Sequence, residues 1–232
     1  MTVGHLPAPS FLASGQRPFL VAHRAGNKLA DLRAAERVAA ALVEADVRLY
    51  RGRLEVRHLK TVGPLPIFWD RWQVVAPWLP RLQLSELLAS TSARTELVLD
   101  LKGRNERLLT HALAALEPHL GRRRFTVCAR HWGMLDAFAG LPVRRVCSVG
   151  NPRQLRRFLT RFAGRRLEGV SIHERLLDAE SVSSVRAIAE VVMTWPVNRP
   201  ERGRELLRLG VHGLITDDAA GMARARVLGA TT

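Results

Sequence analysis

The feature that most constrains the fold is an eightfold alternation of short apolar, strand-like runs with stretches of helical sequence. Most runs end at turn residues and are followed by leucine- and alanine-containing sequence with charges at helical spacing. The expected strands are residues 18–22, 43–50, 96–103, 125–129, 143–149, 169–172, 191–195 and 212–216. Strand–helix–strand units build parallel sheets, and eight of them in succession are the pattern of a (β/α)8 TIM barrel. The sequence therefore predicts an α/β barrel.

The expected helices include residues 29–42, 84–90, 132–139, 152–163, 200–209 and one that starts at about 219. A chain of 232 residues suits one large domain, so residues 1–232 are expected to form a single barrel with an N-terminal extension at 1–17. Residues 51–84 interrupt the alternation, and their prolines and tryptophans predict a short irregular insertion after the second strand. Trp69, Trp72 and Trp78 in this insertion are expected to form either a satellite core or a wall for an apolar substrate tail.

Acidic side chains interrupt the apolar pattern of the second expected strand. Val43, Ala45 and Val47 share one face of this strand, whereas Glu44 and Asp46 share the other. A strand at a sheet edge with its polar face in water would explain this spacing equally well. The strand–helix–strand context instead predicts a sheet buried on both faces, where neighbouring carboxylates repel each other and lose their hydration. Such a pair requires a cation, and a divalent metal ion would supply one.

The third expected strand repeats this arrangement. Its leucines at 97, 99 and 101 share one face, and Asp100 and Lys102 lie on the other. The inward face of the predicted barrel thus gains a third acid and a lysine. These residues follow or end their strands at the carboxyl side, which is where barrel enzymes place their active sites.

Motifs on the first three strands resemble the glycerophosphodiester phosphodiesterase family. HRAGN at 23–27 is similar to the family's His-Arg-Gly, and VEADV at 43–47 is similar to its Glu-x-Asp-Val. VRH at 56–58 supplies the second histidine, which the family places on a following hairpin. DLK at 100–102 corresponds to the family's Glu-x-Lys, with an aspartate in place of the glutamate.

The resemblance continues to the last two strands. TWPVN at 194–198 is similar to the family's Trp-Thr-Val-Asn, and LGVHGLITDD at 209–218 is similar to its Gly-Val-Asp-Gly-Ile-Ile-Thr-Asp. Two departures occur near the first motifs. The family's Glu-Asn-Thr triplet is absent after residue 27, and Leu59 follows the second histidine where the family has an aspartate.

The resemblance implies a metal-dependent phosphodiesterase that hydrolyses a glycerophosphodiester to glycerol phosphate and an alcohol in lipid metabolism. It implies one Mg²⁺ or Ca²⁺ on Glu44, Asp46 and Asp100, acid and base roles for His23 and His58, and phosphate contacts from Arg24 and Lys102. Trp195 is the candidate for an aromatic contact to the substrate, with a core role as an equal alternative. The alternative functions are a phospholipase-D-like enzyme acting on lysophospholipids and a catalytically decayed barrel that binds anions or lipids.

The chain is strongly basic, with a formal net charge of +15, and all but three of its 36 basic residues are arginine. The arginines are scattered over expected helices and loops, which favours a solvated basic surface over a strip that binds nucleic acid. Transient contact with an anionic membrane surface remains an alternative. The partner that we expect is a small-molecule phosphodiester.

The sequence contains no apolar stretch long enough for a signal peptide or a membrane span, which predicts a cytoplasmic protein. In that compartment Cys128 and Cys147 are expected to be reduced core residues. His131 and His173 follow expected strands and could reach the same end of the barrel, but a structural role is the more common one for such histidines.

Overall fold

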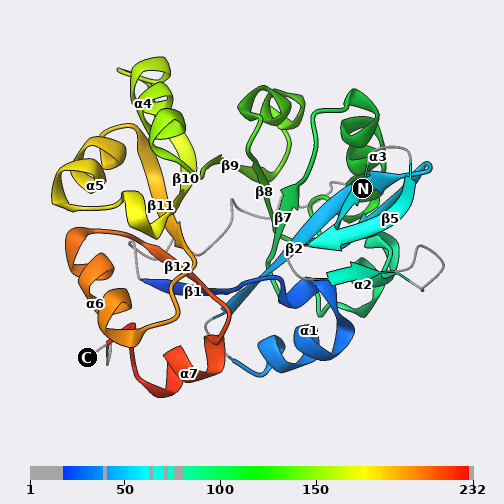
Figure 1. Ribbon diagram of the computed structural model, residues 1–232, viewed down its shortest axis with the longest axis horizontal. Coiled ribbons are helices and arrows are strands. Elements are labelled where there is room, and N and C mark those ends of the chain that lie inside the picture. Colours follow the sequence, from blue (N-terminus) through cyan, green and yellow to red (C-terminus); the bar gives the residue numbers. More distant parts are fainter. Residues whose placement is uncertain (1–17, 39–40, 63–64, 71–72, 76–80, 230–232) are drawn as a thin grey trace.

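The computed structural model describes residues 18–38, 41–62, 65–70, 73–75 and 81–229. Eight parallel strands are arranged in the order β1-β12-β11-β10-β9-β8-β7-β2, and β2 pairs with β1 to close the barrel (Figure 1). The barrel strands are β1 (Phe19–Ala22), β2 (Ala41–Tyr50), β7 (Leu97–Leu101), β8 (Phe125–Ala129), β9 (Val143–Val149), β10 (Leu167–His173), β11 (Ala189–Trp195) and β12 (Gly213–Thr216). The predicted (β/α)8 architecture is confirmed.

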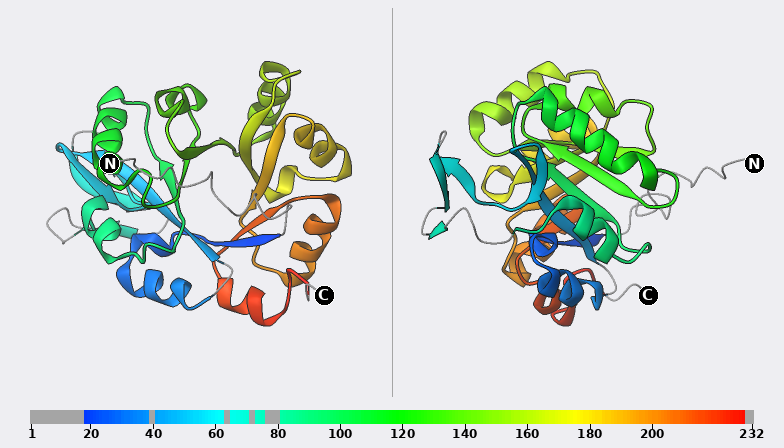
Figure 2. Two further views of the ribbon diagram at one scale, coloured as in Figure 1. Left: turned by 180° about the vertical axis from the view of Figure 1, so that it is seen from behind. Right: turned by 90° about the vertical axis from the view of Figure 1, so that its right-hand side faces the viewer.

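Helical segments connect the strands and surround the barrel (Figures 1 and 2). The α-helices are α1 (Leu29–Glu36), α2 (Leu84–Ser90), α3 (Glu106–Leu116), α4 (Pro152–Arg161), α5 (Ala179–Arg186), α6 (Pro200–Leu209) and α7 (Ala219–Arg224). The 3-10 helices are η1 (Ala25–Asn27), η2 (Glu117–His119), η3 (Trp132–Phe138) and η4 (Glu174–Leu176). Within the described part of the chain, no helix has both the length and the apolar character needed to cross a membrane.

The alternation along β2 separates two environments. Val43, Ala45 and Val47 are fully buried in the layer between strands and helices, as predicted. Leu42, on the opposite face, packs in a smaller apolar cluster with Val98 of β7 and side chains from other barrel strands. Farther along the same face, the apolar side chains give way to acids near the carboxyl ends of the strands. The barrel therefore has an apolar lower interior and a polar mouth.

The first helix is shorter than the sequence predicts. Residues 29–42 were expected to be helical, but α1 ends at Glu36 and β2 begins at Ala41. The backbone of residues 41–43 pairs with residues 20–22 of β1, and this pairing closes the barrel. Closure of the sheet thus outweighs the helical preference of the alanines in this segment.

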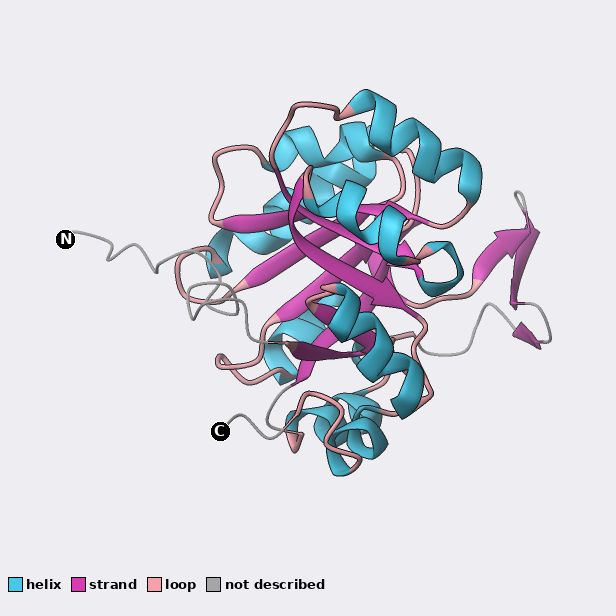
Figure 3. Cartoon of the chain, turned by 90° about the vertical axis from the view of Figure 1, so that its left-hand side faces the viewer, coloured by secondary structure: helices cyan, strands magenta, loops and turns pink. Residues whose placement is uncertain are grey.

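The predicted insertion after the second strand is present at 51–84, but its described residues form strands and are not irregular. β3 (Arg53–Val56) pairs with β2 as an antiparallel hairpin, and β4 (Lys60–Val62), β5 (Leu65–Asp70) and β6 (Gln73–Val75) form a second antiparallel sheet. Figure 3 places this small sheet to one side of the barrel. Pro66 does not prevent the pairing, because it lies at a register shift between β4 and β5 and has no partner residue in β4.

Several expectations concern residues outside the described ones. The extension at 1–17, Trp72 and Trp78 all fall there. The backbone of Trp69 lies in β5, paired with Lys60 and Val74. The role of the tryptophans stays a prediction. The two cysteines, by contrast, are free and buried, as expected.

Candidate active site

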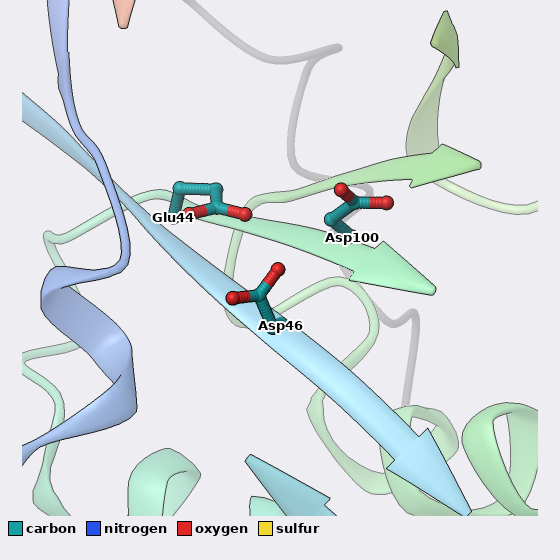
Figure 4. A group of neighbouring side chains, drawn as sticks. All are labelled: Glu44, Asp46 and Asp100. Carbon is teal, nitrogen blue, oxygen red and sulfur yellow. The ribbon is translucent and has the colours of Figure 1, made fainter. Parts of the chain in front are cut away.

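Three carboxylates converge at the mouth of the barrel. Glu44 and Asp46 extend from β2, and Asp100 extends from β7, where it stands in register with Asp46 (Figure 4). One oxygen from each acid lies within 4.8 Å of the others. The side chains of Glu44 and Asp46 are buried, and that of Asp100 is 17% exposed. The period of two in a strand thus produces the cluster that the sequence predicts.

Asp46 is the most heavily bonded of the three acids. Its Oδ2 accepts hydrogen bonds from Asn27 Nδ2 at 2.9 Å and from His58 Nδ1 at 3.1 Å. Its Oδ1 lies 2.8 Å from Lys102 Nζ, and its own N–H donates to Asn27 Oδ1 at 2.9 Å. Burial opposes ionisation, but the hydrogen bond from His58 and the charge of Lys102 hold the pKa of Asp46 well below its usual value.

Glu44 is in the opposite situation. Burial raises the pKa of this carboxyl well above its usual value, and the negative charges of Asp46 and Asp100 raise it further. The charge of Lys102 and a hydrogen bond from the Arg24 N–H at 2.6 Å only partly compensate. Glu44 therefore lacks sufficient positive charge around it.

The acid cluster fits a hard divalent cation. Carboxylate oxygens are the ligands that Mg²⁺ and Ca²⁺ prefer, and a cation would remove the repulsion that disfavours ionised Glu44. Lys102 compensates part of the charge from one side, since its Nζ contacts both Asp46 and Asp100. Although burial opposes its protonation, these acids hold the pKa of Lys102 well above its usual value.

Arg24 joins the first strand to the acid cluster. Its backbone is in the left-handed region, with φ of 56°, and its N–H points at Glu44 Oε2. Its Nη2 donates to His58 Nε2 at 3.0 Å. Because a guanidinium can only donate, His58 Nε2 accepts here and Nδ1 carries the proton donated to Asp46.

His23 has a similar arrangement on the other side of the site. Its Nδ1 lies 2.7 Å from Asp217 Oδ1, just beyond β12, and Asn198 Nδ2 donates to Asp217 Oδ2 at 2.7 Å. The hydrogen bond from His23 lowers the pKa of Asp217 to about 2. Both histidines therefore have Nδ1 fixed by a carboxylate, so Nε2 is the atom that can transfer a proton, although in His58 this atom accepts from Arg24 Nη2 in this structure.

These contacts reveal three residues that we did not predict as part of the site: Asn27, Asn198 and Asp217. All three lie within the motifs quoted for the resemblance. Asn27 positions Asp46, and Asn198 positions Asp217 through its Nδ2 and through its Oδ1, which accepts from the Asp217 N–H at 2.9 Å. The motifs located these residues, but only the closed barrel shows what each one contacts.

A cavity of about 990 Å³ opens at this end of the barrel. Seven of the eight predicted site residues line it: His23, Arg24, Glu44, His58, Asp100, Lys102 and Trp195. Asp46, the eighth, is 1% exposed and contacts the lining residues His58 and Lys102. The structure therefore brings the whole predicted set together.

The aromatic and histidine candidates at the far side of the cavity have packing roles as well. Trp195 packs against the apolar cluster inside the barrel, and its ring centroid lies 4.9 Å from that of His173. His173 Nδ1 accepts a hydrogen bond from the Arg175 N–H at 3.2 Å, at the start of η4. Both residues also line the cavity, so the roles of Trp195 and His173 toward a substrate stay predictions.

The comparisons with known proteins agree on the fold. An Oleispira antarctica phosphodiesterase, solved in complex with the product sn-glycerol-3-phosphate, superposes with a TM-score of 0.72 at 19% identity, over 92% of this chain and 98% of that one. A Thermotoga maritima glycerophosphodiester phosphodiesterase superposes with a TM-score of 0.70 at 20% identity, over 90% of this chain and 98% of that one. A glycerophosphodiester phosphodiesterase from Agrobacterium tumefaciens superposes with a TM-score of 0.60 at 16% identity, over 90% of this chain and 99% of that one.

No family profile and no curated protein matches the sequence of this chain. The structural comparison therefore carries the result: the chain has the barrel fold of the glycerophosphodiester phosphodiesterases. The resemblance seen in the motifs is confirmed at the level of the fold.

Proposed function

We propose that this protein is a divergent glycerophosphodiester phosphodiesterase, a phosphoric diester hydrolase that releases glycerol phosphate and an alcohol. The observation that carries the proposal is the convergence of three carboxylates, two histidines, an arginine and a lysine at the carboxyl end of the barrel. A phosphodiester is a stable anion, so its hydrolysis needs charge neutralisation, an activated nucleophile and a protonated leaving group. The site offers residues for each requirement.

Glu44, Asp46 and Asp100 would hold one Mg²⁺ or Ca²⁺, which when bound polarises the phosphoryl oxygens. Arg24 and Lys102 bind the non-bridging oxygens, Arg24 through its planar fork and Lys102 as a point charge. In the resting site Arg24 Nη2 blocks His58 Nε2, so binding of the phosphate to Arg24 also frees this histidine.

The two histidines share the proton transfers. One Nε2 takes a proton from water as its oxygen forms a bond to phosphorus, and the other gives a proton to the ester oxygen as its bond to phosphorus breaks. Asp46 and Asp217 hold the opposite nitrogen of each ring and so orient His58 and His23. Trp195 forms an apolar wall for the substrate.

The setting that fits this activity is lipid metabolism in the cytoplasm. Cys128 and Cys147 are both unpaired and buried, which suits a reducing compartment. We propose that the whole chain is one catalytic domain. Its substrate is a small-molecule diester, and its basic surface allows transient contact with an anionic membrane.

The test is phosphorus NMR of glycerophosphocholine incubated with the purified protein and Mg²⁺, Ca²⁺ or Mn²⁺ in turn. We expect conversion to glycerol phosphate with at least one of these ions and none with a chelator in excess. Lysophosphatidylcholine in a parallel tube distinguishes the phospholipase-D-like alternative. If neither diester is converted with any ion, the proposal is wrong and the binding-barrel alternative replaces it.

A further inference from the structure

A second cavity, of about 490 Å³, lies beside the first, and four of its nine lining residues are arginines. Arg104 follows β7, Arg130 follows β8, and Arg157 and Arg161 come from α4. We call these four residues, together with His131, the arginine pocket. No lining residue is acidic. Because the loops after β7, β8 and β9 all emerge at one end of a parallel barrel, the arginine pocket lies at the same end as the acid cluster.

Three of the four guanidinium groups, those of Arg104, Arg157 and Arg161, are held by contacts that leave their charge uncompensated. Arg104 Nε donates to His131 Nε2 at 2.8 Å, so this histidine is neutral. Arg157 lies over the indole of Trp132, with 5.9 Å from Cζ to the ring centroid, and Arg161 lies over Phe162 at 5.6 Å. Among the described residues, none of the four arginines forms an ion pair with a carboxylate.

The four arginine side chains are exposed, and the ring contacts of Arg157 and Arg161 support a role for these groups in binding. Arginines stacked on rings keep the edge of the guanidinium, with its N–H groups, available for a ligand. Gln154 lines the same cavity, and its Oε1 already accepts from the Gly150 N–H at 2.8 Å, so its remaining group is an N–H donor. The cavity therefore presents hydrogen-bond donors and positive charge, and no acidic side chain lines it.

The arginine pocket adjoins the active-site cavity. Arg130 and His131 line both cavities. Gly150, at the end of β9, allows this placement, because a Cβ there would lie 2.8 Å from Arg130 Nη2. A ligand attached to a phosphodiester in the first cavity can therefore extend past Arg130 into the second.

We infer that the arginine pocket is a second anion subsite, which binds a phosphomonoester carried by the alcohol part of the diester. This inference rests on the proposed function, since it concerns the substrate of that site. A phosphomonoester carries close to two negative charges and three acceptor oxygens, which match several guanidinium forks better than a carboxylate does. The cavity has room for such a group, and Arg157 lies over one face of Trp132, so that face is not free for the stacking of bases.

The test compares two diesters that differ by one phosphate: glycerophosphoinositol and glycerophosphoinositol 4-phosphate. We expect the wild-type kcat/KM to be at least about tenfold higher for the phosphorylated diester, mainly through a lower KM. Arg157→Ala should lower this ratio about threefold, as the loss of one charged hydrogen bond at an exposed side chain predicts. The double variant Arg157→Ala/Arg161→Ala should bring the ratio to about one.

Arg153→Ala and Arg156→Ala are the matched controls. Both arginines are exposed on α4 and lie outside the lining of either cavity. These variants carry the same loss of charge on the same helix, so the ratio should remain at the wild-type value. An equal fall in the controls would mean that general surface charge causes the preference, and it would overturn the inference.

Calorimetry separates this inference from the proposed function. Glycerophosphoinositol 4-phosphate is titrated into each protein with a chelator present, so no turnover is expected. If neither diester is hydrolysed but binding depends on Arg157 and not on Arg153, the subsite stands and the proposed function fails. If both are hydrolysed with a ratio of about one in the wild type, the function stands and the subsite is wrong. If inorganic phosphate competes with glycerophosphoinositol 4-phosphate at equal concentration, the pocket binds free phosphate and the inferred substrate subsite is wrong. If a short single-stranded oligonucleotide displaces this diester at the same concentration, the assignment to a small molecule is overturned.

Discussion

Asp217→Ala tests how the site orients His23. The Asp217 carboxylate lies 2.7 Å from His23 Nδ1 and is itself held by Asn198 Nδ2. A hydrogen bond to a charged group is worth about 1.5–3 kcal/mol when it is shielded from water. The side chain of Asp217 is 54% exposed, so we take less than half of this, about 1 kcal/mol. This predicts a fall in kcat/KM of roughly fivefold to tenfold.

The assay is steady-state hydrolysis of a glycerophosphodiester, with divalent-metal affinity measured by calorimetry on the same samples. The fall should occur in kcat, and metal affinity should remain unchanged, because Asp217 is outside the acid cluster. Asp218→Ala is the matched control: this adjacent acid accepts a hydrogen bond from the Gly221 N–H at 2.7 Å and caps α7. The control should lose stability, by about 1 kcal/mol, without losing activity. A change of less than twofold in Asp217→Ala, or an equal loss in the control, would refute the orienting role.

Three further predictions concern stability. Gly26→Ala should destabilise the protein by about 1–3 kcal/mol in chemical denaturation, because the new Cβ would lie 2.7 Å from Ala45 Cβ; an unchanged midpoint would contradict this close contact. Without metal, Glu44→Gln should leave the melting temperature unchanged or raise it, since it removes the repulsion from Asp46 and Asp100. Asp46→Asn should lower the melting temperature, because Asp46 accepts hydrogen bonds that the amide cannot all accept. A lower melting temperature for Glu44→Gln than for Asp46→Asn would contradict the charge assignment. Burial raises the pKa of Glu96 from 4.5 to about 7, so the free energy of unfolding of the wild type should fall by up to about 3 kcal/mol as the pH rises from 4.5 through 7. The free energy of unfolding of Glu96→Gln should fall less over the same range. Parallel pH profiles of the two proteins would refute this.

The residues of the acid cluster could be predicted because they depend on local periodicity. Side chains alternate along a strand, so the spacing of Glu44, Asp46 and Asp100 among buried apolar residues places all three on the inward face. The chain order of the strands in a barrel then brings β2 and β7 together. No long-range information beyond the fold itself was needed.

The contacts that position the histidines could not be predicted in this way. His23 and Asp217 are 194 residues apart in sequence, and they meet only because β12 pairs with β1 when the barrel closes. The arginine pocket has the same origin, since its residues come from three separate connections. The sequence places each of these residues near the mouth, but the contact itself depends on the tilt and register of the closed sheet.

The two errors in secondary structure also have physical causes. The high helix propensity of alanine makes the predicted helix at 29–42 longer than the observed one, because the β1–β2 pairing overrides that propensity from Ala41 onward. The insertion at 51–84 was taken as irregular because its prolines are strong turn signals and its strands are short. Short antiparallel strands leave little periodicity to detect.

Metal dependence of hydrolysis tests the central claim most directly. The protein is first treated with a chelator and dialysed, and Mg²⁺ or Ca²⁺ is then added in steps while glycerophosphocholine hydrolysis and the heat of binding are followed on the same preparation. The site of Glu44, Asp46 and Asp100 predicts one ion bound per chain, activation at the concentration where that ion binds, and loss of both in Glu44→Gln. Full hydrolysis with the chelator still present, or unchanged metal affinity in Glu44→Gln, would contradict the assignment of these three carboxylates as the metal site of a phosphodiesterase.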